Sequence, residues 1–385
     1  MMLPEREVLA LHREIVEIPS VSGNEAPLAD FLEERLRRYK AAPERVGNSL
    51  LALAGEGPVL LLDTHLDTVP PAPGWTRDPW QVVPEEGPEG GKIHGLGSND
   101  AKAAVAGMVA AFIAFQNVAL PFTLALALVE GEETKGTGTQ AVLEELARRG
   151  LDLEAAVIGE PTGLDLAVAQ KGLMVLELVA RGTACHAAHA AALGAVNAAR
   201  RLARDLVALE RVDFGPAHTH LGPITLEPTQ VRAGTARNVV PGEATAILDV
   251  RTTPALAREE IVRRIQAAVE GEVRVLSDRL LPKETRPDLP LVEAARRARP
   301  DARVYGSATL SDMALLNGTP AVKCGPGKSE RSHTPDEFVL ESEVLDGARF
   351  YTRLVGTYAE LRRPHPPAPS PIAPPSTGRG GDYGA

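Results

Sequence analysis

Short apolar runs that alternate with helical patterns constrain the fold of this 385-residue chain more than any other feature. The runs lie at residues 59–62, 123–129, 155–158 and 320–322. Dense apolarity over so few residues is typical of strands buried on both faces, as in a parallel sheet under helices. Helical periodicity lies at residues 6–17, 26–39, 101–116 and 139–149. The alternation predicts an open α/β sheet.

The middle of the chain follows a different pattern. Strand signals lie at residues 174–180, 224–232, 244–250 and 272–276, and helical signals lie at 187–207 and 257–269. The order β-α-β-β-α-β is that of a ferredoxin-like unit. We therefore predict an α/β domain in residues 1–171 and 282–361, interrupted by an α+β domain at 172–281. Residues 362–385 are rich in Pro, Gly and Ser and predict a disordered tail.

Composition excludes several classes of partner. The net charge is −10 and aromatic residues make up 4%, which argues against a nucleic-acid or membrane surface. Two cysteines cannot build a disulfide framework or a four-thiolate zinc site. The first residues have the pattern of an amphipathic helix, not of a signal peptide, and no apolar run is long enough to span a bilayer. We therefore predict a cytoplasmic protein.

Polar residues follow each of the four buried runs. Because ligands of open α/β sheets bind beyond the carboxyl ends of the strands, these residues are expected at one rim. They are His65, Asp67, Glu132, Glu133, Glu160 and His333, and the loop at 95–100 adds Asp100. Period-two geometry places Asp67 on the same side as His65, where its carboxylate is expected to accept an imidazole N–H.

This residue set predicts a metal centre. Two histidines and several carboxylates without thiolates favour zinc, with cobalt or manganese as alternatives. So many carboxylates share a small site only if metal ions or protons neutralise them. Their number predicts two divalent ions about 3.5–4 Å apart, with a carboxylate between them.

Each residue also has an ordinary interpretation. His65 alone could cap a strand, Asp100 could cap a helix, and the pair Glu132–Glu133 could be solvated. Only their convergence on one rim favours a site. The sequence has no Gly-x-Ser-x-Gly elbow and no dinucleotide fingerprint. Cys185 next to His186 leaves a thiol nucleophile as a weaker alternative.

At these residues the chain resembles the M20 family of di-zinc amidohydrolases. The motifs in family order are His65-Leu-Asp67, Gly97-Ser-Asn-Asp100, Glu132-Glu133, Gly159-Glu160-Pro-Thr and Ser332-His333-Thr-Pro. The resemblance covers the chain to about residue 361. It implies a zinc-peptidase-like α/β catalytic domain with an inserted ferredoxin-like lid that dimerises.

The resemblance also implies a role for each residue. His65 and Glu160 would hold one zinc, Glu133 and His333 the other, and Asp100 would bridge them. Asp67 would orient His65, and Glu132 would be the general base. His186 of the partner subunit would donate to the oxyanion, although Cys185 departs from the small residue usual before it. Asn238 and Arg251 would contact the substrate, and Arg251 suits its carboxylate.

Within the family, the spelling of the loops at 95–101 and 325–334 resembles the acetylornithine deacetylase branch. We therefore expect a homodimer that hydrolyses an N-acyl amino acid, with N-acetylornithine in arginine biosynthesis as the first candidate. A desuccinylase of succinyl-diaminopimelate, an N-acyl-lysine or carrier-lysine hydrolase and a small-peptide peptidase stay open as alternatives. A metal-binding protein without turnover is disfavoured, because Glu132 has no purpose in a purely structural site.

Overall fold

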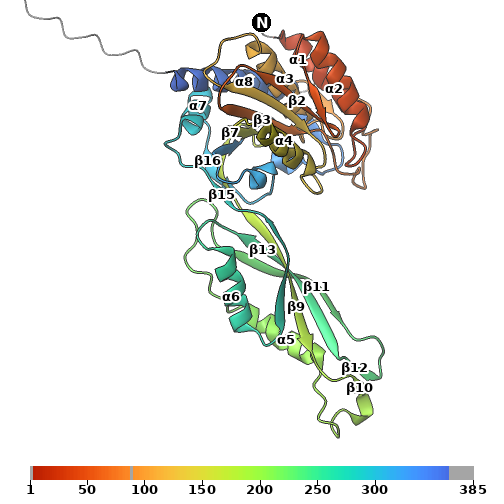
Figure 1. Cartoon of the computed structure of the whole chain (residues 1–385). Helices are drawn as coiled ribbons and strands as arrows, with labels where there is room; N and C mark the ends of the chain where they lie inside the picture. Colours follow the sequence, from red (N-terminus) through yellow and green to blue (C-terminus); the bar gives the residue numbers. More distant parts are fainter. Residues whose placement is uncertain (1–2, 87–89, 364–385) are drawn as a thin grey trace, which may run out of the picture.

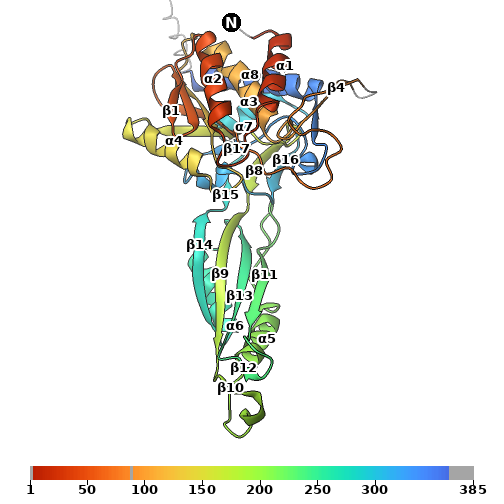
Figure 2. The ribbon, with the colours of Figure 1, turned by 90° about the vertical axis from the view of Figure 1, so that its right-hand side faces the viewer.

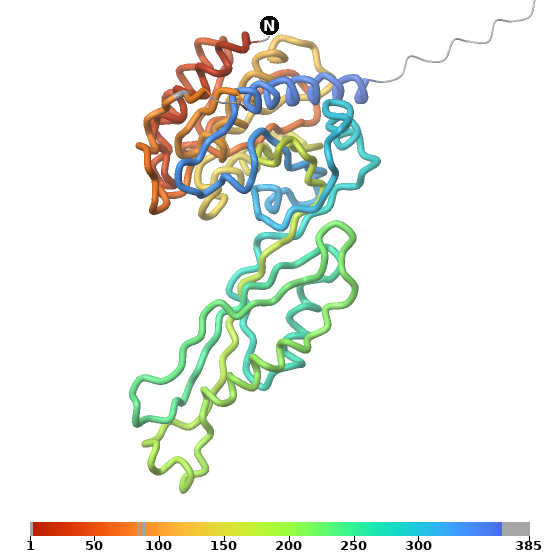
Figure 3. The backbone as a smooth tube through the Cα atoms, turned by 180° about the vertical axis from the view of Figure 1, so that it is seen from behind, coloured from red at the N-terminus to blue at the C-terminus, as the bar shows by residue number. Residues whose placement is uncertain are grey.

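The computed structural model describes residues 3–86 and 90–363 and consists of two parts (Figure 1). One part is a layered α/β domain, and the other is a narrow lid that extends away from it (Figure 2). The two connections to the lid lie side by side, because a Cβ atom added to Gly172 would be 2.4 Å from the backbone nitrogen of Pro282. The chain therefore enters and leaves the lid at one place (Figure 3).

A nine-stranded sheet forms the centre of the α/β domain, in the order β1-β2-β6-β3-β7-β17-β8-β15, with β16 also paired to β8. Its strands are β1 (Glu44–Val46), β2 (Ser49–Ala54), β3 (Val59–His65), β6 (Thr123–Val129), β7 (Leu153–Ile158), β8 (Leu166–Gln170), β15 (Lys283–Glu284), β16 (Val304–Ser307) and β17 (Ala321–Lys323). The neighbours β6, β3, β7 and β17 are parallel, whereas β2 pairs antiparallel with β6 and β17 with β8. The predicted α/β fold is confirmed, but the sheet is mixed rather than parallel throughout.

Helices cover both faces of this sheet. On one face lie α1 (Glu5–Val16), α2 (Ala26–Arg38), α3 (Lys102–Phe115), α7 (Pro290–Ala298) and α8 (Glu341–Arg362). The other face carries α4 (Thr137–Arg148) and the 3₁₀ segment η2 (Asp312–Leu315). Successive residues of β3 alternate between the two layers, since Leu60 and Leu62 pack with the first set and Leu61 with the second. The four helices predicted from periodicity begin and end within two residues of the observed ones.

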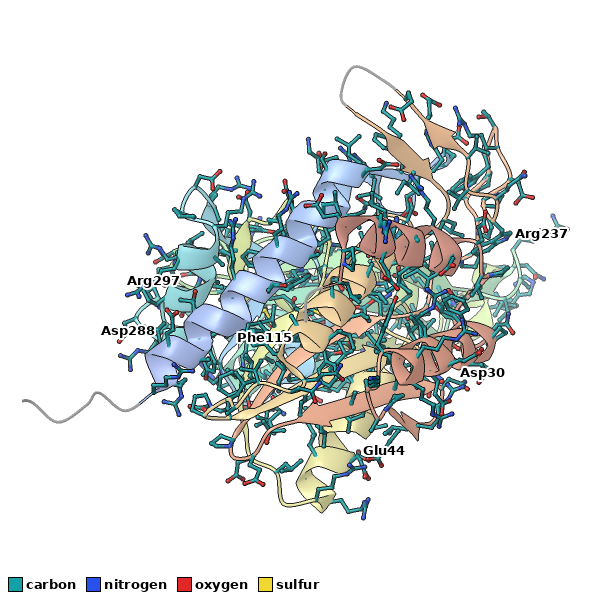
Figure 4. All side chains as sticks on the ribbon, turned by 90° about the horizontal axis from the view of Figure 1, so that it is seen from above. Asp30, Glu44, Phe115, Arg237, Asp288 and Arg297 are labelled. Atoms are coloured by element: carbon teal, nitrogen blue, oxygen red, sulfur yellow. The ribbon has the colours of Figure 1, made fainter. Side chains whose placement is uncertain are left out.

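Helix α3 is buried along almost its whole length. It lies between the sheet and α8, and Phe115 at its end lies beside α8 when the domain is seen from above (Figure 4). A Cβ atom at Gly107 would be 3.1 Å from the ring of Tyr351 on α8. The alanines of α3 and its Gly107 therefore allow the close contact with α8.

The lid is a four-stranded antiparallel sheet in the order β11-β13-β9-β14, with two helices on one face. The strands are β9 (Gly172–Arg181), β11 (Thr225–Ala233), β13 (Glu243–Thr252) and β14 (Glu272–Leu280), and the helices are α5 (Ala198–Leu209) and α6 (Arg258–Ala268). This is the predicted β-α-β-β-α-β order. The alternating residues Met174, Leu176 and Leu178 of β9 face the helices.

One predicted element of the lid is wrong. The helix expected at 187–207 begins only at Ala198, after Asn197, whose side-chain oxygen accepts a hydrogen bond from the Arg200 N–H. The preceding residues form β10 (Cys185–His186), the 3₁₀ turn η1 (Ala187–His189) and an irregular segment in which Gly194 has a φ of 58°. Helix propensity from alanine is overridden because this exposed segment packs against no core.

The remaining elements are small. Strands β4 (Pro84–Glu85), β5 (Lys92–His94) and β18 (Phe338–Leu340) form one sheet, β10 pairs with β12 (Val239–Val240), and η3 (Ser329–Arg331) is a 3₁₀ turn. Helix α8 extends one residue into the predicted tail, whose residues 364–385 lie outside the described ones. Among the described residues, no helix combines the length and the apolarity that crossing a membrane requires.

Candidate metal centre

Neighbouring parallel strands of the α/β domain deliver their following residues to one rim. His65 is the last residue of β3, and Glu160 follows β7 by two residues. Gly131, with a φ of 70°, turns the chain after β6 just before Glu132. A Cβ atom at Gly159 would lie 2.9 Å from the side chains of Ala104 and Thr64, so only glycine lets the Glu160 segment approach α3. Backbone geometry thus dictates where the polar side chains lie.

The side chains at the rim form three overlapping groups of metal-ligand atoms, each within 4.8 Å. The groups are His65, Asp100 and Glu160; His65, Glu132 and Glu133; and Asp100, Glu133 and His333. Asp100 lies between the histidines, with Oδ1 at 3.2 Å from Nε2 of His65 and Oδ2 at 3.7 Å from Nε2 of His333. A carboxylate with its two oxygens turned to two histidines has the geometry of a bridge between two ions. The structure brings all six residues together.

The excess of buried carboxylates in this cluster favours the binding of cations. Burial and the charge of Asp100 raise the pKa of Glu160 to about 8, and burial and Glu160 raise the pKa of Glu132 well above its usual range. The hydrogen bond to Glu133 raises the pKa of His333 to about 9. Without cations, these carboxyl groups and His333 would retain protons at neutral pH. Divalent cations fit the same nitrogen and oxygen donors and would displace those protons.

Asp67 has a different contact from the one predicted. The Nδ1–H of His65 donates to the backbone carbonyl of Asp67 at 2.9 Å, while the nearest carboxylate oxygen lies 3.6 Å from Nδ1. The Asp67 carboxylate instead accepts the backbone N–H groups of Glu132 and Glu133, at 3.1 and 3.2 Å, and the Ser22 hydroxyl. Asp67 therefore fixes the tautomer of His65 through its backbone and holds the loop of Glu132 through its side chain.

Glu337 is a buried residue of the centre that sequence reasoning missed. Its carboxylate accepts the N–H groups of Gly97, Asn99 and Asp100, at 3.2, 2.9 and 2.9 Å. Burial and the charge of Asp100 raise the pKa of Glu337 to about 8. It fixes the loop that presents Asp100. The sequence signal for Glu337 was its position four residues after His333, but a single Glu after Pro-Asp does not by itself indicate a role.

Asn99 connects that loop to the segment before His333. Its Oδ1 accepts the Lys328 N–H at 2.8 Å, and its Nδ2 donates to the Lys328 carbonyl and the Ser332 hydroxyl at 3.1 and 3.3 Å. His333 has a φ of 61°, a left-handed conformation that non-glycine residues adopt mainly where surrounding contacts impose it. Nε2 of His333 lies 2.9 Å from Oε1 of Glu133.

Further buried charged groups, none of them predicted as a site residue, lie behind the rim. Thr139 lies between two carboxylates, with its hydroxyl 3.0 Å from Asp63 and 2.7 Å from Asp312. Burial raises the pKa of Asp312 to about 6. Lys323, the last residue of β17, is 2% exposed and donates from Nζ to the Thr309 carbonyl and hydroxyl.

The structure places two of the predicted lid residues, His186 and Asn238, away from this rim. His186 and Asn238 lie together at the far end of the lid, where β10 pairs with β12 and the Ala187 N–H donates to the Asn238 carbonyl (Figure 1). Their neighbour Arg237 lies beyond the edge of the α/β domain when seen from above (Figure 4). Arg251 lies on β13 and donates to the Asp249 carboxylate at 2.8 and 3.1 Å. His186 and Asn238 therefore cannot complete the rim of their own subunit in this arrangement.

Comparison with known proteins decides the family. The model of peptidase family M20/M25/M40 matches residues 61–357, which include every rim residue and the whole lid. The chain belongs to this family. The M20 resemblance and the prediction of an amide-hydrolysing enzyme are therefore confirmed, whereas the acetylornithine deacetylase branch stays a proposal.

Individual M20 relatives span nearly the full chain. A peptidase M20 domain-containing protein of Schizosaccharomyces pombe is 29% identical over 361 residues, covering 90% of this chain and 84% of the relative. A succinyl-diaminopimelate desuccinylase of Wolinella succinogenes is 28% identical over 361 residues, covering 88% and 97%. A dinuclear metal-binding M20 peptidase of Bacillus subtilis superposes with a TM-score of 0.71 at 18% identity, covering 91% of this chain and 97% of that one. The last comparison confirms the fold.

Proposed function

We propose that this M20 enzyme hydrolyses the amide bond of a small N-acylated amino acid at a centre of two divalent ions, with zinc as the first candidate and cobalt or manganese as alternatives. One observation supports this most: Asp100 faces His65 with one oxygen and His333 with the other, while Glu132 stays within ligand distance of His65. The dinuclear centre named for the Bacillus subtilis peptidase agrees with this arrangement.

The residues divide into two ligand sets that share Asp100. His65 and Glu160 would hold one ion, and Glu133 and His333 the other. When bound, the pair of ions polarises the amide carbonyl and acidifies the attacking water. Glu132 takes a proton from that water and passes it to the departing amine as the amide bond breaks. Asp67 holds Glu132 in position, because its carboxylate accepts a hydrogen bond from the backbone N–H of that residue.

The lid would supply the remaining contacts from a second subunit. His186 of the partner subunit would donate to the oxyanion, near Asn238 of the partner subunit, since neither residue reaches the rim of its own chain. Large apolar side chains support a homodimer through the lid, because Leu193, Val231 and Val239 are 65%, 56% and 37% exposed there. Arg251 would bind the substrate's α-carboxylate after exchanging its contact to Asp249.

The identity of the acyl group and of the amino acid is the more specific part of the proposal. The loop motifs favour N-acetylornithine, and with it a cytoplasmic enzyme of arginine biosynthesis. The Wolinella succinogenes relative favours succinyl-diaminopimelate as the second candidate. An N-acyl-lysine, a carrier-bound lysine or a small peptide would use the same centre.

Metal-reconstituted enzyme tests the proposal directly. Protein stripped with a chelator should be inactive and should regain activity with zinc, cobalt or manganese. The substrates to assay are N-acetylornithine, succinyl-diaminopimelate, N-acetyl-lysine and a dipeptide. Hydrolysis that persists in chelator would contradict the metal centre, and no turnover of N-acetylornithine would reject the narrower assignment.

A further inference from the structure

The loop between α5 and β11 returns from the lid to the α/β domain (Figure 3). It closes as a small hairpin, because the backbones of His218 and Gly222 exchange two hydrogen bonds of 2.9 Å each. We call residues 218–223 the lid foot. The foot adds a contact between the two parts of the protein to the chain connections at Gly172 and Pro282.

The backbone of the lid foot lies directly against β16. A Cβ atom at Gly306 of β16 would be 2.2 Å from the carbonyl oxygen of His220 and 2.7 Å from Cδ2 of Leu221. Leu221 is buried at this contact. Glycine at position 306 is therefore what allows the foot to approach the strand so closely.

Two poorly exposed side chains hold the foot in this position. Nδ1 of His218 accepts the backbone N–H of His220 at 3.2 Å, so the imidazole carries its proton on Nε2. That Nε2 lies 3.3 Å from Oε2 of Glu284 on β15, and the side chain of His218 is 8% exposed. Lys171, which lies between β8 and β9, is buried and donates from Nζ to the Pro223 carbonyl at 2.7 Å.

The foot lies at one edge of the lid sheet. It leads into β11, which is one edge strand, whereas the other edge strand, β14, contacts η2. A lid attached only through Gly172 and Pro282 could turn about that one place. Contacts at both edges oppose this rotation, so the foot is needed on the β11 side.

The foot is also close to Arg251 of β13. Strand β11 begins at Thr225, two residues after Pro223, and Thr225 is the cross-strand partner of Arg251. Burial and the nearby charge of Arg251 lower the pKa of Lys171. A change in the seat of the foot therefore moves the part of the lid that carries Arg251.

We propose that the lid foot is a positioning element that fixes the angle between the lid and the α/β domain, with Gly306 as its seat and His218 and Lys171 as its fastenings. By fixing this angle, the foot also sets the place of Arg251. This second part rests on the proposed function, in which Arg251 binds the substrate's α-carboxylate. The foot acts through Arg251 and does not itself contact the substrate.

The distance between two spin labels measures the angle without turnover. One label replaces Arg38 on α2 and the other Arg263 on α6, both exposed, in a Cys185→Ala background, since the remaining Cys324 is buried. Dilution into unlabelled chain leaves one labelled copy in any dimer. We expect one narrow distance distribution for the unaltered foot.

Three variants weaken the foot at different points. Gly306→Val removes the seat, His218→Ala removes the contact to Glu284, and Lys171→Met removes the contact to Pro223, so each should broaden or shift the distribution. His220→Ala is the matched control, because its side chain is exposed and only its backbone meets β16. It should leave the distribution unchanged.

A matched pair of substrates connects the angle to Arg251, namely one N-acyl amino acid with a free α-carboxylate or an α-carboxamide. In zinc-loaded enzyme, His218→Ala and Lys171→Met should lower the preference for the carboxylate, given by the ratio of the two kcat/KM values, about 10-fold, mainly through KM. His220→Ala should keep the preference of wild type.

The outcomes separate the proposals. If the distributions of all three foot variants match those of wild type and His220→Ala, the lid foot does not set the angle and the inference fails. If the angle changes but the carboxylate preference does not, the link to Arg251 fails. If zinc-loaded wild type hydrolyses no N-acyl compound, the proposed function fails, while the distances still decide the role of the foot. His218→Ala and Lys171→Met keep the test valid if Gly306→Val does not fold.

Discussion

The candidate metal centre and the tip of the lid both contain histidines, but only the centre brings them together with carboxylates. At the centre, His65 and His333 come from segments 268 positions apart and share Asp100 between them. At the lid tip, His186 lies on β10 and Asn238 directly precedes its partner strand β12, and among the described residues neither belongs to a cluster of metal-ligand side chains. A site that one chain completes can be recognised by its distances. In the proposed arrangement the lid residues act only when a second chain brings them to the centre, so a single chain shows no site there.

The two regions also differ in how deeply their charged side chains are buried. The α/β domain buries ionisable groups such as His12, Asp63 and Lys102, which are 0–1% exposed. The lid keeps ion pairs such as Arg181–Glu272 near the surface, where solvent weakens them. Function and pH sensitivity are therefore expected to concentrate in the α/β domain.

The largest effect is expected from Glu132→Gln. Because it removes the proposed general base, kcat should fall by about 10²- to 10⁴-fold while both metals stay bound. Steady-state rates and metal analysis of the same sample measure this. Asp67→Asn is a useful companion, since it perturbs the same loop without removing the base. Unchanged kcat in Glu132→Gln would contradict the mechanism.

The next effect tests whether the lid acts across subunits. His186→Ala should lower kcat by about 10²- to 10³-fold, because an oxyanion donor is lost. Mixing and reassembling it with inactive Glu132→Gln should restore about a quarter of wild-type activity, since half of the dimers would then contain one intact site. His189→Ala is the neighbouring control. Mixtures that stay inactive would favour a site built within one chain.

Acid should destabilise the α/β domain through His12. Burial lowers the pKa of His12 to about 4, and its Nε2–H donates to the Ser98 carbonyl at 2.8 Å. The folded-state pKa lies below the unfolded one, so this contribution is complete above pH 6.5 and is lost as pH falls toward 4. The loss amounts to about 3 kcal/mol. Denaturant unfolding followed by the fluorescence of Trp75 and Trp80, both in this domain, measures it.

A matched variant isolates the His12 contribution. His12→Gln should reduce the slope of unfolding free energy against pH between pH 6.5 and 4, whatever its effect at pH 7. An equal slope in both proteins would show that other groups dominate acid unfolding.

The smallest effect is expected from Glu337→Gln. The variant keeps one oxygen acceptor for the Asp100 loop but places an amide NH₂ where Glu337 offers its second oxygen, so metal affinity should fall about 10- to 100-fold. At saturating zinc, kcat should return close to wild type. Competition with a zinc chelator measures the affinity, and a kcat that stays low at saturation would point to a direct role in turnover.

Sequence patterns predicted the parts of this protein that depend on periodicity and on strand ends. His65 and Glu160 were predicted to converge because buried strands precede them, and the structure places their ligand atoms together. The contact of Asp67 was wrong, since period-two geometry gives the side of a strand but not the path of the loop at Glu132. Lys323 and Glu337 were missed, because partners distant in sequence, such as Thr309 and Asp100, define what they do.

Helix propensity also gave a wrong prediction in the lid, where tertiary contacts decide where the helix begins. The segment before Ala198 is rich in alanine yet has no core to pack against, so the long lid helix was overpredicted. The antiparallel pairing of β2 with β6 was missed, because no strand was predicted at residues 49–54.

The adjacency of Gly172 and Pro282 bears on how such an enzyme diversifies. Since the lid begins and ends at one spot on the surface of the α/β domain, a short linker there could replace all of residues 172–281 without stretching the sheet. The lid can thus be lengthened, exchanged or deleted in the course of evolution while the α/β domain keeps its own fold.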